Sequence, residues 1–184
     1  MTLIYDADYL KGLLNSVSDD VYDYLQSEPV SNCVFVGILT NGLFFAKRIQ
    51  TLLAKKGMMI ESPAMGLDIS LYRDDLQSKN KQYMTVSGTQ KPIQLDNKHV
   101  VLFDDVLCTA RTARAALNAI FDYGRPTKVS FVVLFDRLHR QVPIEPNITG
   151  QMLDVDMANR VNVQFVEVVG DDGVITVPFK EGYI

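Results

Sequence analysis

The chain has 184 residues, a formal net charge of −4 and a hydrophobic content of 47%, which predict one globular domain over residues 1–184 with a substantial core. The acidic balance gives no overall attraction to nucleic acid or to an anionic membrane, and two cysteines with two histidines favour neither a disulfide framework nor a zinc site. With no signal peptide and no apolar run long enough for a membrane span, we expect a cytoplasmic protein.

The first elements follow from the spacing of apolar residues. Helical spacing predicts a helix over residues 6–26, and the apolar run of residues 33–39 predicts a buried strand. A turn over residues 40–42 then leads into an amphipathic helix over residues 43–56.

The next segment changes character. Residues 67–72 alternate between apolar and polar and predict a strand. Residues 73–95 are polar and nearly free of hydrophobic residues, and such a long insert in a compact domain is usually functional or disordered. We interpret residues 73–95 as a lid, with a plain exposed loop as the alternative.

The most informative stretch is residues 99–112. A buried strand, residues 100–103, precedes two adjacent carboxylates, Asp104 and Asp105, and a loop that carries two hydroxyls and one cation. A helical pattern begins after Thr112, so free backbone N–H groups and the positive end of a helix dipole point into this loop. That geometry suits a phosphate, while the two acids suit hydroxyl groups or a metal ion beside it.

Further strands are predicted over residues 129–135, 161–169 and 174–177, and His99 is expected on the surface.

Strands alternate with helices, so the predicted fold class is α/β, with a mostly parallel central sheet and helices on both faces. Ligands of such sheets bind beyond the carboxyl ends of the strands. The loops that follow the first, the central and the next buried strand should therefore open on one common edge.

Residues 99–112 resemble the phosphoribosyl pyrophosphate (PRPP) signature of the type I phosphoribosyltransferases. The resemblance implies that Asp104 and Asp105 hold the ribose hydroxyls, directly or through Mg²⁺ and water. It also implies a loop around the 5′-phosphate, formed by Val106, Leu107, Cys108, Thr109, Ala110, Arg111 and Thr112. Ala110 stands where the family usually has glycine, and alanine at positive φ would carry a strain of about 1 kcal/mol. The alternative is a loop geometry that alanine tolerates.

Other segments narrow the resemblance to the PyrR family of pyrimidine operon regulators, which also act as uracil phosphoribosyltransferases. These segments are residues 33–42, 68–76, 124–126, 136–140 and 143–144. The resemblance implies a type I phosphoribosyltransferase fold with a flexible lid and an activity that converts uracil and PRPP to UMP and pyrophosphate with Mg²⁺. It also implies at least a homodimer.

The resemblance extends to the rest of the site. Backbone N–H groups would bind pyrophosphate at Thr40, Asn41 and Gly42. Arg73, beside the lid, would cap the developing charge, and Asp136 and Arg137 would lie near the base. The family usually has arginine in the pyrophosphate turn, so Asn41 leaves the leaving group with one cation fewer.

His139 and Arg140 match a pair that the family uses to bind RNA. Asp19, Glu145 and Gln151, however, stand where the family tends to have basic groups, and carboxylates on such a face repel phosphates. We therefore interpret the pair as a solvated strand end or a dimer contact rather than as an RNA site.

Three departures from the family pattern, Asn41, Ala110 and the segment after Gly150, fall within one predicted active site. They leave two alternatives open beside the uracil enzyme. One is a catalytically weak or inactive nucleotide-sensing regulator that uses the same pocket for UMP or UTP. The other is a phosphoribosyltransferase for a different base, such as a purine or xanthine.

Overall fold

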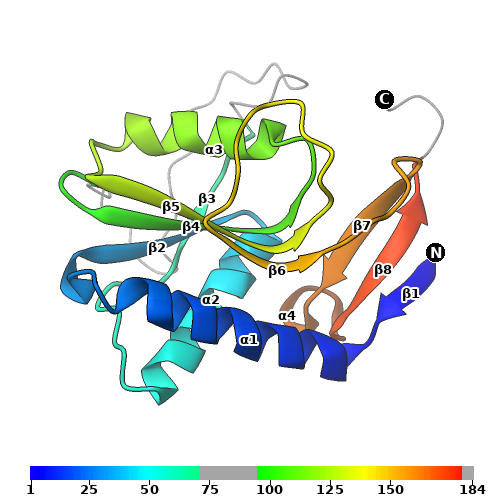
Figure 1. Cartoon of the computed structure of the whole chain (residues 1–184), viewed down its shortest axis with the longest axis horizontal. Coiled ribbons are helices and arrows are strands. Elements are labelled where there is room, and N and C mark those ends of the chain that lie inside the picture. The colour runs from blue at the N-terminus through cyan, green and yellow to red at the C-terminus, as the bar shows by residue number, and fades with distance from the viewer. Residues whose placement is uncertain (71–94, 180–184) are drawn as a thin grey trace.

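The computed structural model describes residues 1–70 and 95–179, which fold as an α/β domain (Figure 1). Within these residues a central sheet contains five parallel strands in the order β3-β2-β4-β5-β6. Its strands are β2 (Cys33–Ile38), β3 (Met65–Leu67), β4 (His99–Leu107), β5 (Lys128–Asp136) and β6 (Ile148–Met152). The predicted parallel sheet is confirmed, although the sequence pattern did not indicate β6.

Helices cover both faces of the central sheet, as predicted. α1 (Ala7–Leu25) and α2 (Asn41–Lys55) lie on one face and α3 (Arg111–Asp122) lies on the other (Figure 1). Each face buries its own cluster of apolar side chains, so the hydrophobic effect holds three layers together. The Asp6 carboxylate accepts a hydrogen bond from the Tyr9 N–H at 2.9 Å and caps α1.

The connection from α1 to β2 is a short 3₁₀ helix (Val30–Asn32). α2 already begins at Asn41, so the predicted turn over residues 40–42 is wrong beyond Thr40 and becomes the first turn of the helix. In the part of the chain that the structure describes, no helix combines the length and the apolar character that crossing a bilayer would require.

A second, antiparallel sheet was not indicated by the alternation of strands and helices. In this small sheet the strand order is β1-β8-β7, formed by β1 (Thr2–Tyr5), β7 (Asn159–Gln164) and β8 (Gly173–Pro178). A hydrogen bond between Asn41 and the Val163 carbonyl joins the start of α2 to β7. The small sheet therefore adjoins the carboxyl edge of the central sheet (Figure 1).

The predicted strand over residues 161–169 is wrong in its second half, where the chain forms α4 (Val166–Val169). The cause is a tertiary contact with α2. The Arg48 guanidinium lies 4.6 Å from the centroid of the Phe165 ring and forms an ion pair with Glu167. These contacts turn the chain away from the extended direction of β7.

The predicted strand over residues 67–72 is confirmed at Leu67 but wrong at residues 68–70, because β3 ends at Leu67. The Asp68 carboxylate accepts a hydrogen bond from the Ser70 N–H at 2.9 Å, and such a local side-chain contact competes with strand pairing. Residues 71–94, which include Arg73 and almost all of the predicted lid, lie outside the described residues.

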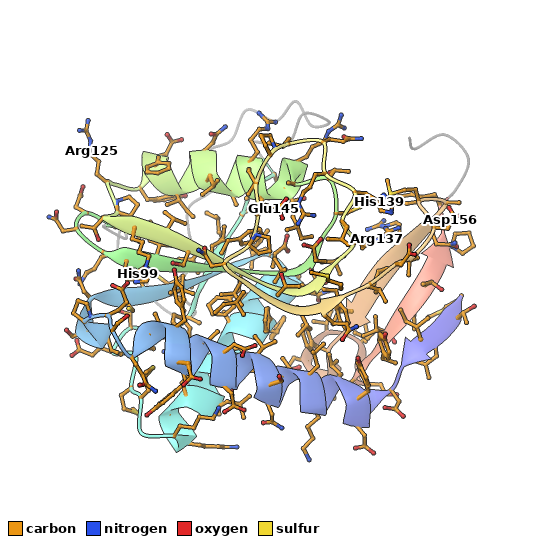
Figure 2. All side chains as sticks on the ribbon, in the orientation of Figure 1. His99, Arg125, Arg137, His139, Glu145 and Asp156 are labelled. Atoms are coloured by element: carbon orange, nitrogen blue, oxygen red, sulfur yellow. The ribbon has the colours of Figure 1, made fainter. Side chains whose placement is uncertain are left out.

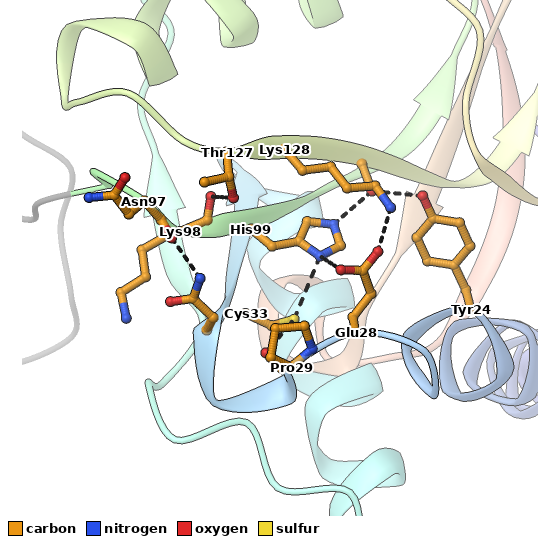
Figure 3. A network of polar contacts seen from close by, with 11 residues as sticks. Tyr24, Glu28, Pro29, Cys33, Asn97, Lys98, His99, Thr127 and Lys128 are labelled. Carbon is orange, nitrogen blue, oxygen red and sulfur yellow. Dashed lines mark hydrogen bonds and ion pairs between the residues drawn. The ribbon is translucent and has the colours of Figure 1, made fainter.

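A buried polar network lies at the opposite end of β4 (Figure 3). His99 is only 3% exposed, so its predicted surface position is wrong, because β4 is a central strand with neighbours on both sides. Its Nε2 lies 2.8 Å from the Ser130 hydroxyl, and its Nδ1 lies 3.7 Å from the Cys33 Sγ. Nδ1 is also 3.7 Å from a carboxylate oxygen of Glu28, which Lys128 binds at 2.7 Å.

This network makes stability depend on pH. Burial lowers the pKa of His99, against the attraction of Glu28 and together with the repulsion of Lys128. The folded state therefore favours neutral His99. The contribution of His99 to the free energy of unfolding is fully present above its unfolded-state pKa of about 6.5, and it is lost as the pH falls below that value. We expect His99→Gln to flatten this acid-side decline in urea unfolding measured across a pH series.

His139→Gln is the matched control, because it removes the other histidine of the chain. If the two variants have the same slope of unfolding free energy against pH, His99 does not carry the effect.

Candidate active site

The carboxyl ends of β2, β4 and β5 meet at one edge of the central sheet, as predicted. The Asn41 side chain, just after β2, donates a hydrogen bond to Asp105 on β4 at 2.8 Å. The Arg137 N–H, just after β5, donates to the Leu107 carbonyl of β4 at 2.8 Å. Residues far apart in the sequence therefore surround the end of one central strand.

Close backbone contact holds the start of α2 against this edge. A Cβ atom on Gly42 would lie 2.4 Å from the carbonyl oxygen of Phe103, and a Cβ atom on Gly37 would lie 2.2 Å from the carbonyl oxygen of Gly42. Only glycine fits at these two positions. The peptide bond between Leu39 and Thr40 is cis.

The two carboxylates, Asp104 and Asp105, lie within β4 and not in the loop after it, because the strand continues to Leu107. Asp104 is buried, and one of its carboxylate oxygens accepts a hydrogen bond from the Asp105 N–H at 3.1 Å. Burial, together with the charge of Asp105, raises the pKa of Asp104 well above its usual range. Burial also raises the pKa of Asp105, against the hydrogen bond from Asn41. The pair therefore favours a ligand that brings hydroxyl donors or positive charge.

The β4–α3 loop (residues 108–110) leads directly into the N-terminus of α3. Ala110 has φ 66° and ψ 9°, so it adopts the left-handed conformation, and of the two possibilities that the sequence left open the structure supports the strained backbone. The Thr109 hydroxyl accepts a hydrogen bond from the Arg111 N–H at 3.4 Å. Arg111 and Thr112 already belong to the first turn of α3, and a helix N-terminus of this kind suits an anion.

Asp136 is 2% exposed and is fully engaged by protein groups. One of its carboxylate oxygens accepts hydrogen bonds from Arg140 Nη1 and from the Leu138 N–H, each at 2.8 Å. Burial opposes ionisation, but these bonds prevail and lower the pKa of Asp136. Arg140 Nη1 also donates to the Cys108 carbonyl at 3.1 Å, so the Asp136–Arg140 pair supports the β4–α3 loop.

Arg137 is buried beside the segment that follows β6 (Figure 2). Its Nη2 donates to the carbonyl oxygens of Val155 at 2.8 Å and Asp156 at 3.0 Å. Its Nε is buried and has no hydrogen-bond partner among the described residues. No sequence pattern predicts this contact, because backbone carbonyl groups are common to all residues.

Asn41, the acidic pair, the β4–α3 loop, Asp136, Arg137 and Arg140 thus lie at one edge of the central sheet. Arg73 lies outside the described residues. A parallel sheet whose central strand ends in an acidic pair and an anion-binding helix N-terminus, next to a small antiparallel sheet, is the arrangement of a type I phosphoribosyltransferase. The sequence profile of the phosphoribosyl transferase domain matches residues 7–167.

Sequence comparison with known proteins refines this class. The chain is 42% identical over 175 residues to the bifunctional protein PyrR of Limosilactobacillus reuteri, covering 93% of this chain and 95% of that protein. It is 39% identical to the bifunctional protein PyrR of Bacillus cereus, with 94% of each chain covered. The chain belongs to the PyrR family.

Comparison with solved structures supports the fold. The hypoxanthine phosphoribosyltransferase of Trypanosoma cruzi superposes with a TM-score of 0.69 at 15% sequence identity and 98% coverage of both chains. A second structure of that enzyme gives a TM-score of 0.70 at 17% identity, covering 98% of this chain and 91% of the other. At this identity the likeness concerns the fold alone.

The conformation of Ala110 leads to a prediction about stability. Ala110→Gly relieves about 1 kcal/mol of backbone strain, but glycine also costs about 0.5–1 kcal/mol in conformational entropy. We therefore expect little change in the free energy of unfolding. Ala110→Val places a β-branched side chain at positive φ in a buried position and should cost about 2–4 kcal/mol of unfolding free energy. Urea unfolding measures both values.

Ala119→Val, in the buried face of α3, is the control for overpacking without backbone strain. A loss in Ala110→Val no larger than in this control would show that the left-handed conformation carries no strain.

Proposed function

We propose that this protein is a uracil phosphoribosyltransferase that converts uracil and PRPP to UMP and pyrophosphate, and that it acts in pyrimidine gene regulation in the cytoplasm. The acidic pair at the end of β4, followed by the β4–α3 loop in a chain of the PyrR family, is the observation that carries the proposal.

The chemistry needs no protein nucleophile. Displacement at the anomeric carbon passes through an oxocarbenium-like state as pyrophosphate leaves, so the protein must position the reactants and stabilise charge. Backbone N–H groups at the start of α3, with the Thr109 and Thr112 hydroxyls, would hold the 5′-phosphate. Asp104 and Asp105 would accept hydrogen bonds from the ribose hydroxyls and so fix the sugar ring.

The leaving pyrophosphate would lie at the start of α2. The backbone N–H groups of Asn41 and Gly42 stand at a helix N-terminus, where the dipole favours negative charge. Arg73 remains our candidate for the cation that caps this charge.

Magnesium fits this donor set. Asp104 and Asp105 offer hard carboxylate oxygens whose burial and mutual repulsion a cation would relieve. Among the described residues no group of three or more His, Cys, Asp or Glu side chains could hold a metal ion. We propose that Asp104 and Asp105 would hold Mg²⁺ together with PRPP and water, and that the ion would there supply charge neutralisation for the pyrophosphate.

For the base, we favour Arg137 over Asp136. Both oxygens of the Asp136 carboxylate are occupied by Arg140, whereas the Nε of Arg137 has a hydrogen to donate and no described acceptor. A carbonyl oxygen of the base would satisfy this buried donor, whose isolation is otherwise costly.

The contacts of Arg140 bear on the regulatory role. Arg140 donates to Asp136 and also to the Ile144 carbonyl and Glu145, so its guanidinium is engaged within the fold. His139 is the half-buried partner of the pair. Our interpretation of the pair as a solvated strand end or a dimer contact rather than an RNA site stays a prediction, as does assembly as a homodimer or a higher oligomer.

The acidic pair gives the first functional test. We expect Asp104→Asn and Asp105→Asn each to lower kcat/KM by about 10²-fold or more, because each removes charge that faces the ribose in the transition state. Pyrophosphate release from PRPP, Mg²⁺ and uracil measures the loss, with Asp20→Asn on the exposed face of α1 as the control. Full activity in both site variants would contradict the assignment.

The same assay with a panel of bases separates the alternatives. Release with a purine or xanthine in place of uracil would assign a different base. No release with any base, while UMP still raises the melting temperature, would favour the nucleotide-sensing regulator.

Arg137 gives a test of the base site. Arg137→Lys keeps the positive charge but loses the planar donor group, so we expect the KM for uracil to rise about tenfold, as for the loss of one hydrogen bond. The KM for PRPP should stay near the wild-type value. Arg140→Lys is the contrasting variant, because it disturbs the β4–α3 loop and should raise the KM for PRPP. Equal effects of both variants on both KM values would argue against a base contact.

A further inference from the structure

The side chain of Asn41 joins three parts of the fold. Its Nδ2 donates one hydrogen bond to the Asp105 carboxylate at 2.8 Å and another to the Val163 carbonyl at 3.0 Å. Asn41 opens α2, Asp105 lies near the end of β4 and Val163 lies in β7 of the small sheet. One amide group therefore links the proposed pyrophosphate site, the proposed ribose site and the small sheet.

The position of this amide leaves it little freedom. The Asn41 Nδ2 has two hydrogens, and the carboxylate and the carbonyl are placed to accept one each. The backbone beside it is pressed against β4 at Gly42, where no Cβ atom would fit. The side chain is therefore directed toward Asp105. It does not supply the positive charge that a longer cationic side chain would place beside the leaving group.

We propose that Asn41 is a positioning residue that orients the Asp105 carboxylate toward the ribose hydroxyls and couples that orientation to the small sheet. The inference rests on the proposed function, since it assumes that Asp105 contacts the ribose. Because Asn41 acts through Asp105, its loss should weaken binding of the ribose and leave the affinity for uracil unchanged.

A second contact between α2 and the small sheet provides the comparison. Arg48, seven residues further along α2, pairs with Glu167 and Asp172 and lies over the Phe165 ring. This clamp holds the small sheet as Asn41 does, but it has no described contact with the acidic pair. If Asn41 had a purely structural role, its substitution would affect the protein in the same way as substitution of Arg48.

The experiment is a double-mutant cycle that measures the affinity of the full-length protein for UMP by calorimetry in the presence of EDTA, so that no metal contributes. We expect Asn41→Ala to weaken UMP binding about tenfold, as for the loss of a hydrogen bond to a charged group. The same change should have almost no effect in an Asp105→Ala background, and its full effect in an Asp104→Ala background.

Two further variants sharpen the cycle. Asn41→Asp keeps the shape but cannot donate, so it should weaken UMP binding at least as much as Asn41→Ala. Arg48→Gln should lower the melting temperature and change the UMP affinity less than twofold. In steady-state assays of Asn41→Ala the KM for PRPP should rise while the KM for uracil stays constant.

The outcomes separate the two proposals. If wild-type protein binds UMP and Asn41→Ala weakens it equally in both aspartate backgrounds, or no more than Arg48→Gln does, the positioning role is wrong and the proposed function stands. If wild-type protein neither binds UMP nor turns over PRPP, the proposed function fails and this inference fails with it.

Discussion

The structure depends on the placement of two adjacent carboxylates at the end of the central strand. Burial and mutual repulsion disfavour Asp104 and Asp105 as a pair of anions, as their raised pKa values show. β4 can hold them because β2 and β5 pair with it on both sides and because each face of the sheet has its own apolar cluster. The free energy gained by burying these apolar clusters offsets the cost of holding two buried carboxylates at a site without its ligand.

Other charged groups serve mainly to hold the frame of this site. The Asp136–Arg140 pair fixes the β4–α3 loop through the Cys108 carbonyl, and Arg48 fastens the small sheet to α2. Partly buried pairs of this kind contribute geometry more than net stability, since desolvation cancels much of their attraction. Arg137 differs, because its buried Nε has no partner among the described residues, which is why we assign it to the ligand.

The sequence predicted the features that arise from local patterns and missed those that arise from distant contacts. The strand, loop and helix around residues 99–112 are local, and the structure agrees, whereas the sequence left the backbone conformation of Ala110 open. The small sheet pairs residues near both ends of the chain, such as Thr2 with Thr176, and no local pattern encodes that pairing. α4 is held against α2 by the contact of Glu167 with Arg48, more than a hundred residues earlier in the chain. His99 was misjudged because strand order, which decides its burial, is a tertiary property.

The residue at position 41 shows how such distant contacts change the meaning of a substitution. From the sequence alone, asparagine in place of arginine means that one cation is missing beside the leaving group. In the folded chain the same residue donates to Asp105 and to Val163, and in our proposal it acts on the ribose through Asp105 instead. The ribose is held in both the ground state and the transition state, whereas pyrophosphate gains charge only as the bond breaks. An interaction shared by both states lowers KM more than it raises kcat, so this exchange favours retention of the nucleotide over rapid turnover. That balance suits a protein whose family combines catalysis with regulation.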